Sequence, residues 1–265
     1  MQKVLVVNDD GYKAAGIRAL IREFRQAYDV VAVAPDREQS WMGKSISGHH
    51  QLHLTPITYH EFDGYHVNGT PADCAQLGLY ETGARPDFVL SGINHGANIG
   101  HGHILSSGTV GAALEAAMQG VPAFATSAWG LHKDEGRPDL NVPETIDLFA
   151  NAAAITRAIV EKVMRLGFPT DTQVIGINVP LTATLDTKWV VTKPHSVPYG
   201  QVFGAHPEGG YANNRYHILE GDEEQGTDLA ALAQGYVSIV PISLQLTSAA
   251  GRADLARKLD IELSD

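Results

Sequence analysis

Short runs of β-branched residues alternate along this chain with segments whose apolar residues recur at helical spacing. The run at 4–7 is followed by one apolar helix face and then by a second run at 30–34. The members of that face follow an i, i+3, i+4, i+7 spacing: Ile17, Leu20, Ile21 and Phe24. This order predicts a β-α-β unit near the start of the chain.

A second unit of the same kind is predicted in the middle of the chain. Its strands are the runs 88–90 and 121–125, and the helix between them stops at Gly120. The helix stripe is made by Val110, Ala113, Leu114 and Ala117. Strand runs that are apolar on both faces are typical of a parallel sheet covered by helices on each side. We therefore predict an α/β fold, with a three-layer Rossmann-like, mostly parallel sheet.

The second half of the chain continues the sheet and then leaves it. A helix is predicted to begin near Pro143 and to carry Ile155, Ile159 and Val163 on its apolar face. Further strands are predicted at 174–177, 189–191 and 236–240, with an amphipathic helix at 249–259. The segment 194–226 is rich in Gly, Pro, Asn, His and acids, which predicts a hairpin arm outside the core. We expect one domain over 1–265, with 194–226 and 245–265 as protruding oligomerisation elements.

Charge and composition exclude several kinds of partner and site. The formal net charge is -11, so the field of the protein repels polyanions, and neither a nucleic-acid polymer nor an anionic membrane is an expected partner. The single cysteine, Cys74, excludes an internal disulfide framework and a thiolate zinc site. The apolar run at the N-terminus is too short for a signal peptide, and no window is long enough to cross a bilayer. We expect a cytoplasmic protein.

Candidate chemistry lies just after the predicted strands, where ligands bind in open α/β sheets. The first such loop is Asn8-Asp9-Asp10-Gly11, in which two neighbouring carboxylates converge where the chain leaves the strand. Converging carboxylates repel each other unless a cation lies between them, although these residue types also form ordinary turns. The second loop ends in Gly43-Lys44-Ser45, which imitates a phosphate-binding loop but lacks the glycine five residues earlier.

The third loop runs from Ser91-Gly92-Ile93-Asn94 to Ser107-Gly108-Thr109, where a helix begins. Free backbone N–H groups and the helix dipole make such a start suitable for a phosphate, whereas the plainer interpretation is an N-cap by Ser107 or Thr109. Thr70, in Gly69-Thr70-Pro71-Ala72-Asp73-Cys74, is interpreted as a structural helix cap. Histidines gather in two groups without a metal-binding spacing: His49, His50, His53, His95, His101 and His103.

Three rival classes lose support from the same loops. A phosphoacceptor receiver domain requires an aspartate after the later strand, where this chain has Ser91-Gly92, and it is about half as long. A serine hydrolase requires a Gly-x-Ser-x-Gly elbow, and dinucleotide binding requires G-x-G-x-x-G; the chain has neither at a strand-to-helix turn. A binding-only α/β module stays open.

Taken together, these loops resemble the SurE family, the survival-protein nucleotidases, over nearly the whole chain. The order and spacing of the matching stretches carry the resemblance: 8–11 with 16–17, 34–37 with Ser40, 69–74, 91–94 with Gly96, Asn98 and Gly100, 107–113, 226–228 and 235–238. The family resemblance implies a phosphomonoesterase that hydrolyses nucleoside 5'- and 3'-monophosphates, uses one divalent metal ion such as Mg²⁺ or Mn²⁺, and forms homodimers or homotetramers through C-terminal arms.

The resemblance also implies roles for individual residues. The metal ligands would be Asp9, Asp10, the Ser40 hydroxyl and the Asn94 amide oxygen, all of them oxygen donors suited to a hard cation. Asp9 and Asp10 would be catalytic, either by activating water or, alternatively, by forming an aspartyl-phosphate. The nucleotide would be bound by Asn8, Asn98, Ser107, Gly108 and Thr109.

Two segments depart from the family pattern. The stretch His101-Gly102-His103-Ile104-Leu105-Ser106 replaces an acid-containing stretch that ends in tyrosine, and it affects the expected rim of the phosphate pocket. Trp41, directly after Ser40, is suited either to stack on a nucleobase or to cover the core.

Overall fold

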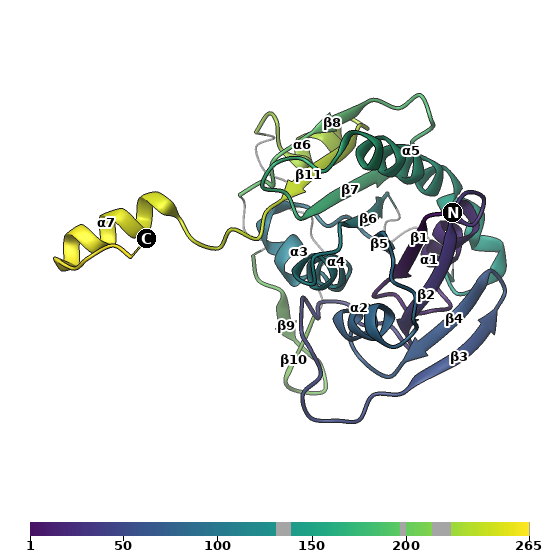
Figure 1. Ribbon diagram of the computed structural model, residues 1–265. Coiled ribbons are helices and arrows are strands. Elements are labelled where there is room, and N and C mark those ends of the chain that lie inside the picture. Colours follow the sequence, from purple (N-terminus) through teal and green to yellow (C-terminus); the bar gives the residue numbers. More distant parts are fainter. Residues whose placement is uncertain (131–138, 197–199, 214–223, 265) are drawn as a thin grey trace.

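The computed structural model describes residues 1–130, 139–196, 200–213 and 224–264. Its centre is a nine-stranded sheet in the order β3-β4-β2-β1-β5-β6-β7-β11-β8, with helices on both faces (Figure 1). The strands are β1 (Lys3–Val7), β2 (Asp29–Pro35), β3 (Leu54–Tyr59), β4 (Phe62–Val67), β5 (Phe88–His95), β6 (Ala123–Trp129), β7 (Val174–Pro180), β8 (Trp189–Val191) and β11 (Val237–Ile242). Strands β9 (Phe203–Ala205) and β10 (Tyr211–Asn213) form a separate two-stranded sheet.

Helices connect most of these strands. They are α1 (Ala15–Phe24), α2 (Pro71–Tyr80), α3 (Gly100–Ser106), α4 (Gly108–Met118), the 3-10 helix η1 (Pro143–Phe149), α5 (Ala150–Leu166), α6 (Asp228–Ala233) and α7 (Ala249–Leu259). Strands β4, β2, β1, β5, β6 and β7 run parallel, whereas β3 and β11 pair antiparallel with β4 and β7. The prediction of a mostly parallel α/β sheet is confirmed.

Alternate residues of the central strands pack into two separate hydrophobic cores, one on each face of the sheet. In β1, Val4 and Val6 pack under α1 and α5, while Leu5 and Val7 pack under α2 and α4. A strand buried on both faces requires this double apolar pattern, which explains the uninterrupted run at its centre. Because α1 and α4 cover opposite faces, the chain changes its winding direction between β1 and β5. This is the topological switch point, where α/β sheets bind ligands.

Two elements differ from their predicted form. The helix expected from Pro143 is a 3-10 helix up to Phe149, and the α-helix that carries Ile155, Ile159 and Val163 begins only at Ala150. The hairpin β3–β4 extends the sheet beyond β2, although its mixed pattern gave no clear strand signal. Exposed and half-buried residues are mixed in β3, and β4 is buried at its first and last residues, as on an edge of the sheet.

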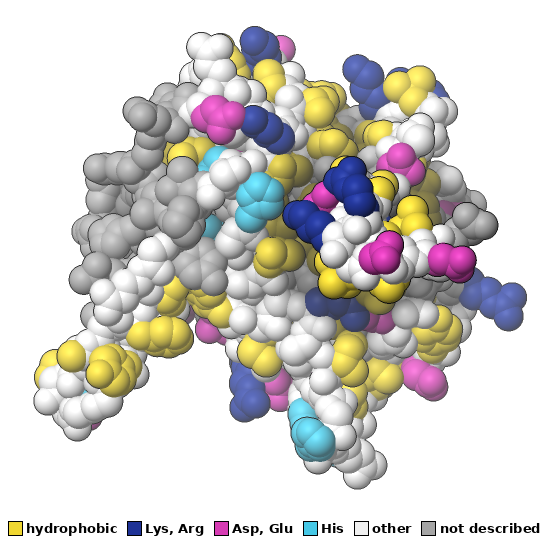
Figure 2. Space-filling model, turned by 90° about the vertical axis from the view of Figure 1, so that its left-hand side faces the viewer, with side chains coloured by type: hydrophobic (Ala, Val, Ile, Leu, Met, Phe, Trp, Pro, Cys, Tyr) yellow, Lys and Arg dark blue, Asp and Glu magenta, His cyan; other side chains and the backbone are white. Residues whose placement is uncertain are grey.

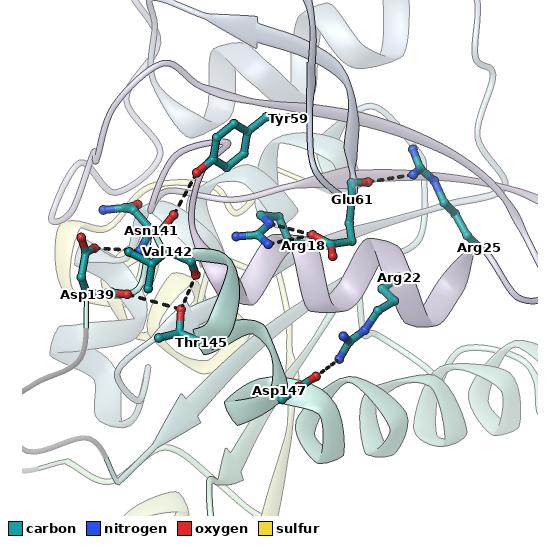
Figure 3. Close-up of polar contacts among 10 residues, drawn as sticks. All are labelled: Arg18, Arg22, Arg25, Tyr59, Glu61, Asp139, Asn141, Val142, Thr145 and Asp147. Carbon is teal, nitrogen blue, oxygen red and sulfur yellow. Dashed lines mark hydrogen bonds and ion pairs between the residues drawn. The ribbon is translucent and has the colours of Figure 1, made fainter.

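Polar contacts hold this edge hairpin to the helices beside it (Figure 3). Arg18 of α1 is fully buried and donates through Nε and Nη2 to Oε2 of Glu61, at 2.9 and 2.8 Å. Arg25 donates from Nη1 to the Glu61 carbonyl at 2.7 Å, and the Tyr59 hydroxyl donates to the carbonyl of Asn141 at 3.0 Å. The turn between β3 and β4 is therefore fixed against α1 by a buried guanidinium.

The C-terminal helix α7 lies away from the body of the molecule, at the end of an extended segment (Figure 1). None of its residues is buried. Viewed from that side, the helix carries hydrophobic and basic side chains together (Figure 2). Its bounds match the predicted terminal helix, and β9 and β10 form the predicted hairpin, although 197–199 and 214–223 of that arm lie outside the described residues.

Within the described ranges, no helix is long and apolar enough to span a membrane.

Candidate functional site at the sheet switch point

The ends of β1 and β5 meet at the switch point through Asp10. Its Oδ2 accepts a hydrogen bond of 3.1 Å from the backbone N–H of His95, the last residue of β5. Asn94 precedes His95 and donates from Nδ2 to the carbonyl of Gly96 at 2.6 Å, so its amide oxygen is the atom suited to a cation. Asp10 and Asn94 are predicted as ligands from separate loops. The structure brings them close together, because Asp10 accepts a hydrogen bond from the residue that follows Asn94.

Asp9 is buried directly against the start of α4. Its side chain is 4% exposed, and Oδ1 accepts a hydrogen bond of 2.6 Å from the hydroxyl of Thr109. A Cβ atom at Gly108 would lie 2.8 Å from Asp9 Cβ and 3.0 Å from Oδ2, so only glycine allows this approach. Burial raises the pKa of Asp9 to about 6, against the lowering effect of the Thr109 hydrogen bond. A cation near this carboxyl group would lower its pKa and favour the charged form.

The loop after β2 reaches the same point. The backbone N–H of Gln39 donates to the carbonyl of Asp9 at 2.8 Å, so the residue before Ser40 contacts the loop that carries the carboxylate pair. The Ser40 hydroxyl hydrogen-bonds to Glu38, whose charge also raises the pKa of Asp9. Glu38 is exposed and follows no recognisable pattern, so the sequence did not single it out as a neighbour of the site.

The helix start opposite the carboxylates has a conventional cap. Ser107 is the N-cap of α4, and its hydroxyl accepts a hydrogen bond of 3.0 Å from the backbone N–H of Val110. Asn98 donates from Nδ2 to the Ser127 hydroxyl at 2.8 Å, and its backbone N–H donates to Asn178 at 2.9 Å. The ends of β6 and β7 thus hold the loop that carries Asn98. Ser127 and Asn178 are further residues of this loop cluster that had no sequence signal.

The donor set fits a hard divalent cation. Two carboxylates, one hydroxyl and one amide oxygen come from loops that the contacts above join. Asn8 adds a second indication, because it is fully buried and its Oδ1 has no hydrogen-bond partner among the described residues. A hydrated cation beside Asp9 would satisfy such an oxygen through a water ligand. Within the same residues, no group of three or more His, Cys, Asp or Glu could hold a metal, so a site here depends on Ser40 and Asn94.

The atypical stretch 101–106 forms most of α3, which is fastened at its start by Asp228. Asp228 is fully buried and accepts from the backbone N–H of Gly100 at 2.7 Å and of His195 at 3.0 Å. On the same helix, His103 contacts the ring of Trp41 at a centroid distance of 5.8 Å, and burial lowers the pKa of this histidine. The Gly226-Thr227-Asp228 stretch therefore anchors the loop that leads to α4.

The other singled-out residues lie apart from these contacts. His50 and His53 contact Asn68, at 3.1 Å from His50 Nε2 to the Asn68 carbonyl and 2.7 Å from the His53 N–H to Oδ1. Thr70 and Asp73 form a complete capping box at the start of α2, which confirms the structural interpretation of Thr70.

Comparison with known proteins gives one consistent result. The family model described as survival protein SurE matches residues 4–200. Two relatives named 5'-nucleotidase SurE are 40% identical over 261 residues in Geobacter metallireducens and 34% identical over 263 residues in Methanospirillum hungatei. These alignments cover 96% of each chain in the first case, and 98% of this chain and 92% of the relative in the second.

Solved structures agree with this result. The crystal structure of the SurE protein from Aquifex aeolicus superposes with a TM-score of 0.76 at 34% identity, covering 97% of this chain and all of the other. The fold and nearly the full length therefore agree, and the chain belongs to the SurE family of survival proteins.

Proposed function

We propose that this protein is a divalent-metal-dependent phosphomonoesterase that hydrolyses nucleoside 5'- and 3'-monophosphates to nucleoside and phosphate. The observation that carries the proposal is the contact between buried Asp9 and Thr109, which joins a carboxylate pair to the positive end of α4. The printed names of the relatives, 5'-nucleotidase, support the same substrate class.

One set of residues would hold the metal ion, and another would hold the substrate phosphate. Mg²⁺ or Mn²⁺ would be held by Asp9, Asp10, the Ser40 hydroxyl and the Asn94 amide oxygen. The cation would polarise the phosphoryl group of the substrate and lower the pKa of a bound water. Because two carboxylates neutralise such a cation, the phosphate must be held by dipoles. The start of α4 at Gly108 presents backbone N–H groups and the positive end of the helix dipole for this purpose.

Phosphate release from a nucleotide panel tests the proposal. AMP, 3'-AMP and p-nitrophenyl phosphate are incubated with the protein and Mg²⁺, Mn²⁺ or EDTA. We expect release with the metals and none with EDTA. Nucleotide binding by calorimetry without any phosphate release would identify a binding-only member of the family. Equal release with EDTA would refute the metal requirement.

The protein is further proposed to act as a homodimer or homotetramer assembled through its projecting elements. Large apolar side chains are exposed on α7 and just after it, where Leu255, Leu259, Ile261 and Leu263 are between 51% and 61% exposed. In the β9–β10 hairpin, Phe203 and Tyr211 are 58% and 80% exposed. Apolar residues on elements that have no core of their own are suited to contacts with a second copy of the chain.

A further inference from the structure

Lys44 belongs to the Gly43-Lys44-Ser45 stretch, the part of the sequence that imitates a phosphate-binding loop. In the structure its ammonium group forms an ion pair with Oε2 of Glu115, in the middle of α4. The Lys44 side chain is 30% exposed and that of Glu115 is 4% exposed. The lysine is therefore directed against the flank of the helix, about two turns beyond the helix start where phosphate is proposed to bind.

Glu115 is a prepared partner for this lysine. Its Oε1 accepts from Gln119 Nε2 at 2.9 Å and from Gln76 of α2, which leaves Oε2 to Lys44. Burial by itself would raise the pKa of Glu115, but the hydrogen bonds from Lys44, Gln76 and Gln119 outweigh it and lower the pKa. The carboxylate is thus held in its charged form at a point where α2 and α4 meet.

Backbone contacts bind the same loop to the helices. The N–H of Gly43 donates to the carbonyl of Ser106 at 2.9 Å. A Cβ atom at Gly111 would lie 2.0 Å from the Gly43 carbonyl oxygen, so the loop crosses α4 in direct contact with its backbone. Two residues on, the Thr70 hydroxyl donates to the carbonyl of Ser45 at 2.6 Å.

Ser40 lies between two fixed points. On one side, Gln39 donates to the carbonyl of Asp9, and on the other Lys44 is fastened to Glu115. The stretch after Ser40 is therefore attached to α4 through the Gly43 backbone and, one residue further, through the ion pair of Lys44 with Glu115. A loop fastened at both ends loses little conformational freedom when its Ser40 hydroxyl ligates a cation.

We infer that Lys44 is a positioning residue, which acts through its ion pair with Glu115 to hold Ser40 at the cation site and does not bind the substrate phosphate. The inference rests on the proposed function, because it assumes that Ser40 is a metal ligand. Partners that orient metal ligands commonly change metal affinity by about 10- to 100-fold when they are removed.

Mn²⁺ titration of the full-length protein, read by the EPR signal of free Mn²⁺, tests this role together with steady-state hydrolysis of AMP. We expect Lys44→Met and Glu115→Gln each to weaken Mn²⁺ binding by about 10-fold, and the double variant to be no weaker than either single one. Lys44→Arg should restore binding to within about 2-fold of the wild type, because it keeps the cation. At saturating Mn²⁺ the KM for AMP should stay unchanged in all of them.

Lys3→Met is the matched control, because Lys3 is similarly exposed and pairs with Asp29 at 3.5 Å where β1 begins, away from the site. Thermal unfolding in EDTA is measured for every variant. The inference is overturned if Lys44→Met binds Mn²⁺ like the wild type, if its binding loss merely follows a lower Tm in EDTA, or if it raises KM for AMP while Glu115→Gln does not. The last outcome would make Lys44 a phosphate ligand. A wild type that binds no Mn²⁺ would overturn the proposed function as well.

Discussion

The hydroxyl of Thr109 donates a hydrogen bond of 2.6 Å to Oδ1 of Asp9, across 100 residues of sequence. Both side chains are buried, at 0% and 4% exposure. Burial raises the pKa of this carboxyl group to about 6 even though the hydrogen bond from Thr109 acts to lower it. Thr109, which the family resemblance places on the phosphate side, therefore also orients the acid that is proposed to bind the cation.

Thr109→Val tests this contact, because valine keeps the shape of threonine and removes the hydroxyl. A hydrogen bond to a charged group contributes about 1.5–3 kcal/mol, so we expect a loss of about 10- to 100-fold in kcat/KM with AMP. Thr109→Ser keeps the donor and should retain most of the activity. Steady-state kinetics at saturating Mn²⁺ make the comparison, and equal rates for the valine and serine variants would contradict the role.

Asp10→Asn removes the second charge and leaves the fold intact. An asparagine retains a side-chain oxygen that can accept the hydrogen bond from the His95 N–H, so the junction of β1 and β5 should survive. We expect loss of metal-dependent AMP hydrolysis and an unchanged far-UV circular dichroism spectrum. Turnover close to that of the wild type in the folded variant would remove Asp10 from the proposed metal site.

Gly108→Ala is expected to inactivate the protein by displacing Asp9. The added methyl group would lie 2.8 Å from Asp9 Cβ and 3.0 Å from Pro71 Cγ, distances at which these atoms must shift. Gly48→Ala is the control, since a Cβ atom there meets nothing within 4 Å. We expect a loss of at least about 100-fold in kcat for the first variant, because small displacements at a reacting centre have effects of that order, and none for the second. A fully active Gly108→Ala protein would show that this close approach is not required.

Local sequence signals located the carboxylate loop and the helix starts. Asp9 and Asp10 follow an apolar run, and Thr70, Ser107 and the residues after them have capping chemistry, so their places could be read from neighbours in sequence. The α/β class followed from strand runs that are apolar on both faces. These features depend on residues that lie within a few positions of each other.

Contacts between distant segments could not be predicted in this way. Asp228 accepts a hydrogen bond from Gly100 over a separation of 128 residues, and Lys44 forms an ion pair with Glu115 of α4, which is distant from it in sequence. The hairpin β3–β4 is an edge whose pairing with β2 depends on the completed sheet. Sequence motifs indicate the residue types of the site, whereas these contacts depend on the tertiary packing of segments that are far apart in the chain.

Removal of the projecting helix tests the proposed assembly. A chain ending at Ser243 lacks α7 and the exposed Leu246, Leu255, Leu259 and Ile261, while the sheet up to β11 is kept. Because the buried cores contain no residue of α7, we expect a folded protein of lower assembly state. Multi-angle light scattering measures the mass. The same oligomer before and after truncation would exclude α7 as a determinant of assembly.

Glu61→Gln should reveal how far the buried Arg18 depends on its partner. The Arg18 side chain is 0% exposed and that of Glu61 is 32% exposed, and Nη1 of Arg18 has no hydrogen-bond partner among the described residues. Burial would raise the pKa of Glu61, but the hydrogen bonds from Arg18 outweigh it and lower the pKa below its ordinary value. The charged form of Glu61 is therefore the one that stabilises the fold.

This direction fixes how stability changes with pH. A carboxyl group whose pKa is lower in the folded protein contributes its full stabilisation above the unfolded value of about 4.3, and loses it as the pH falls through the folded pKa. We expect Glu61→Gln to lower the free energy of unfolding by about 1–2 kcal/mol at pH 7, since the pair is partly exposed to solvent. The difference from the wild type should shrink as the pH falls below that unfolded value and Glu61 takes up a proton. Urea unfolding at several pH values measures both curves, and a difference that stays constant down to pH 3 would show that charge is not the reason for the effect.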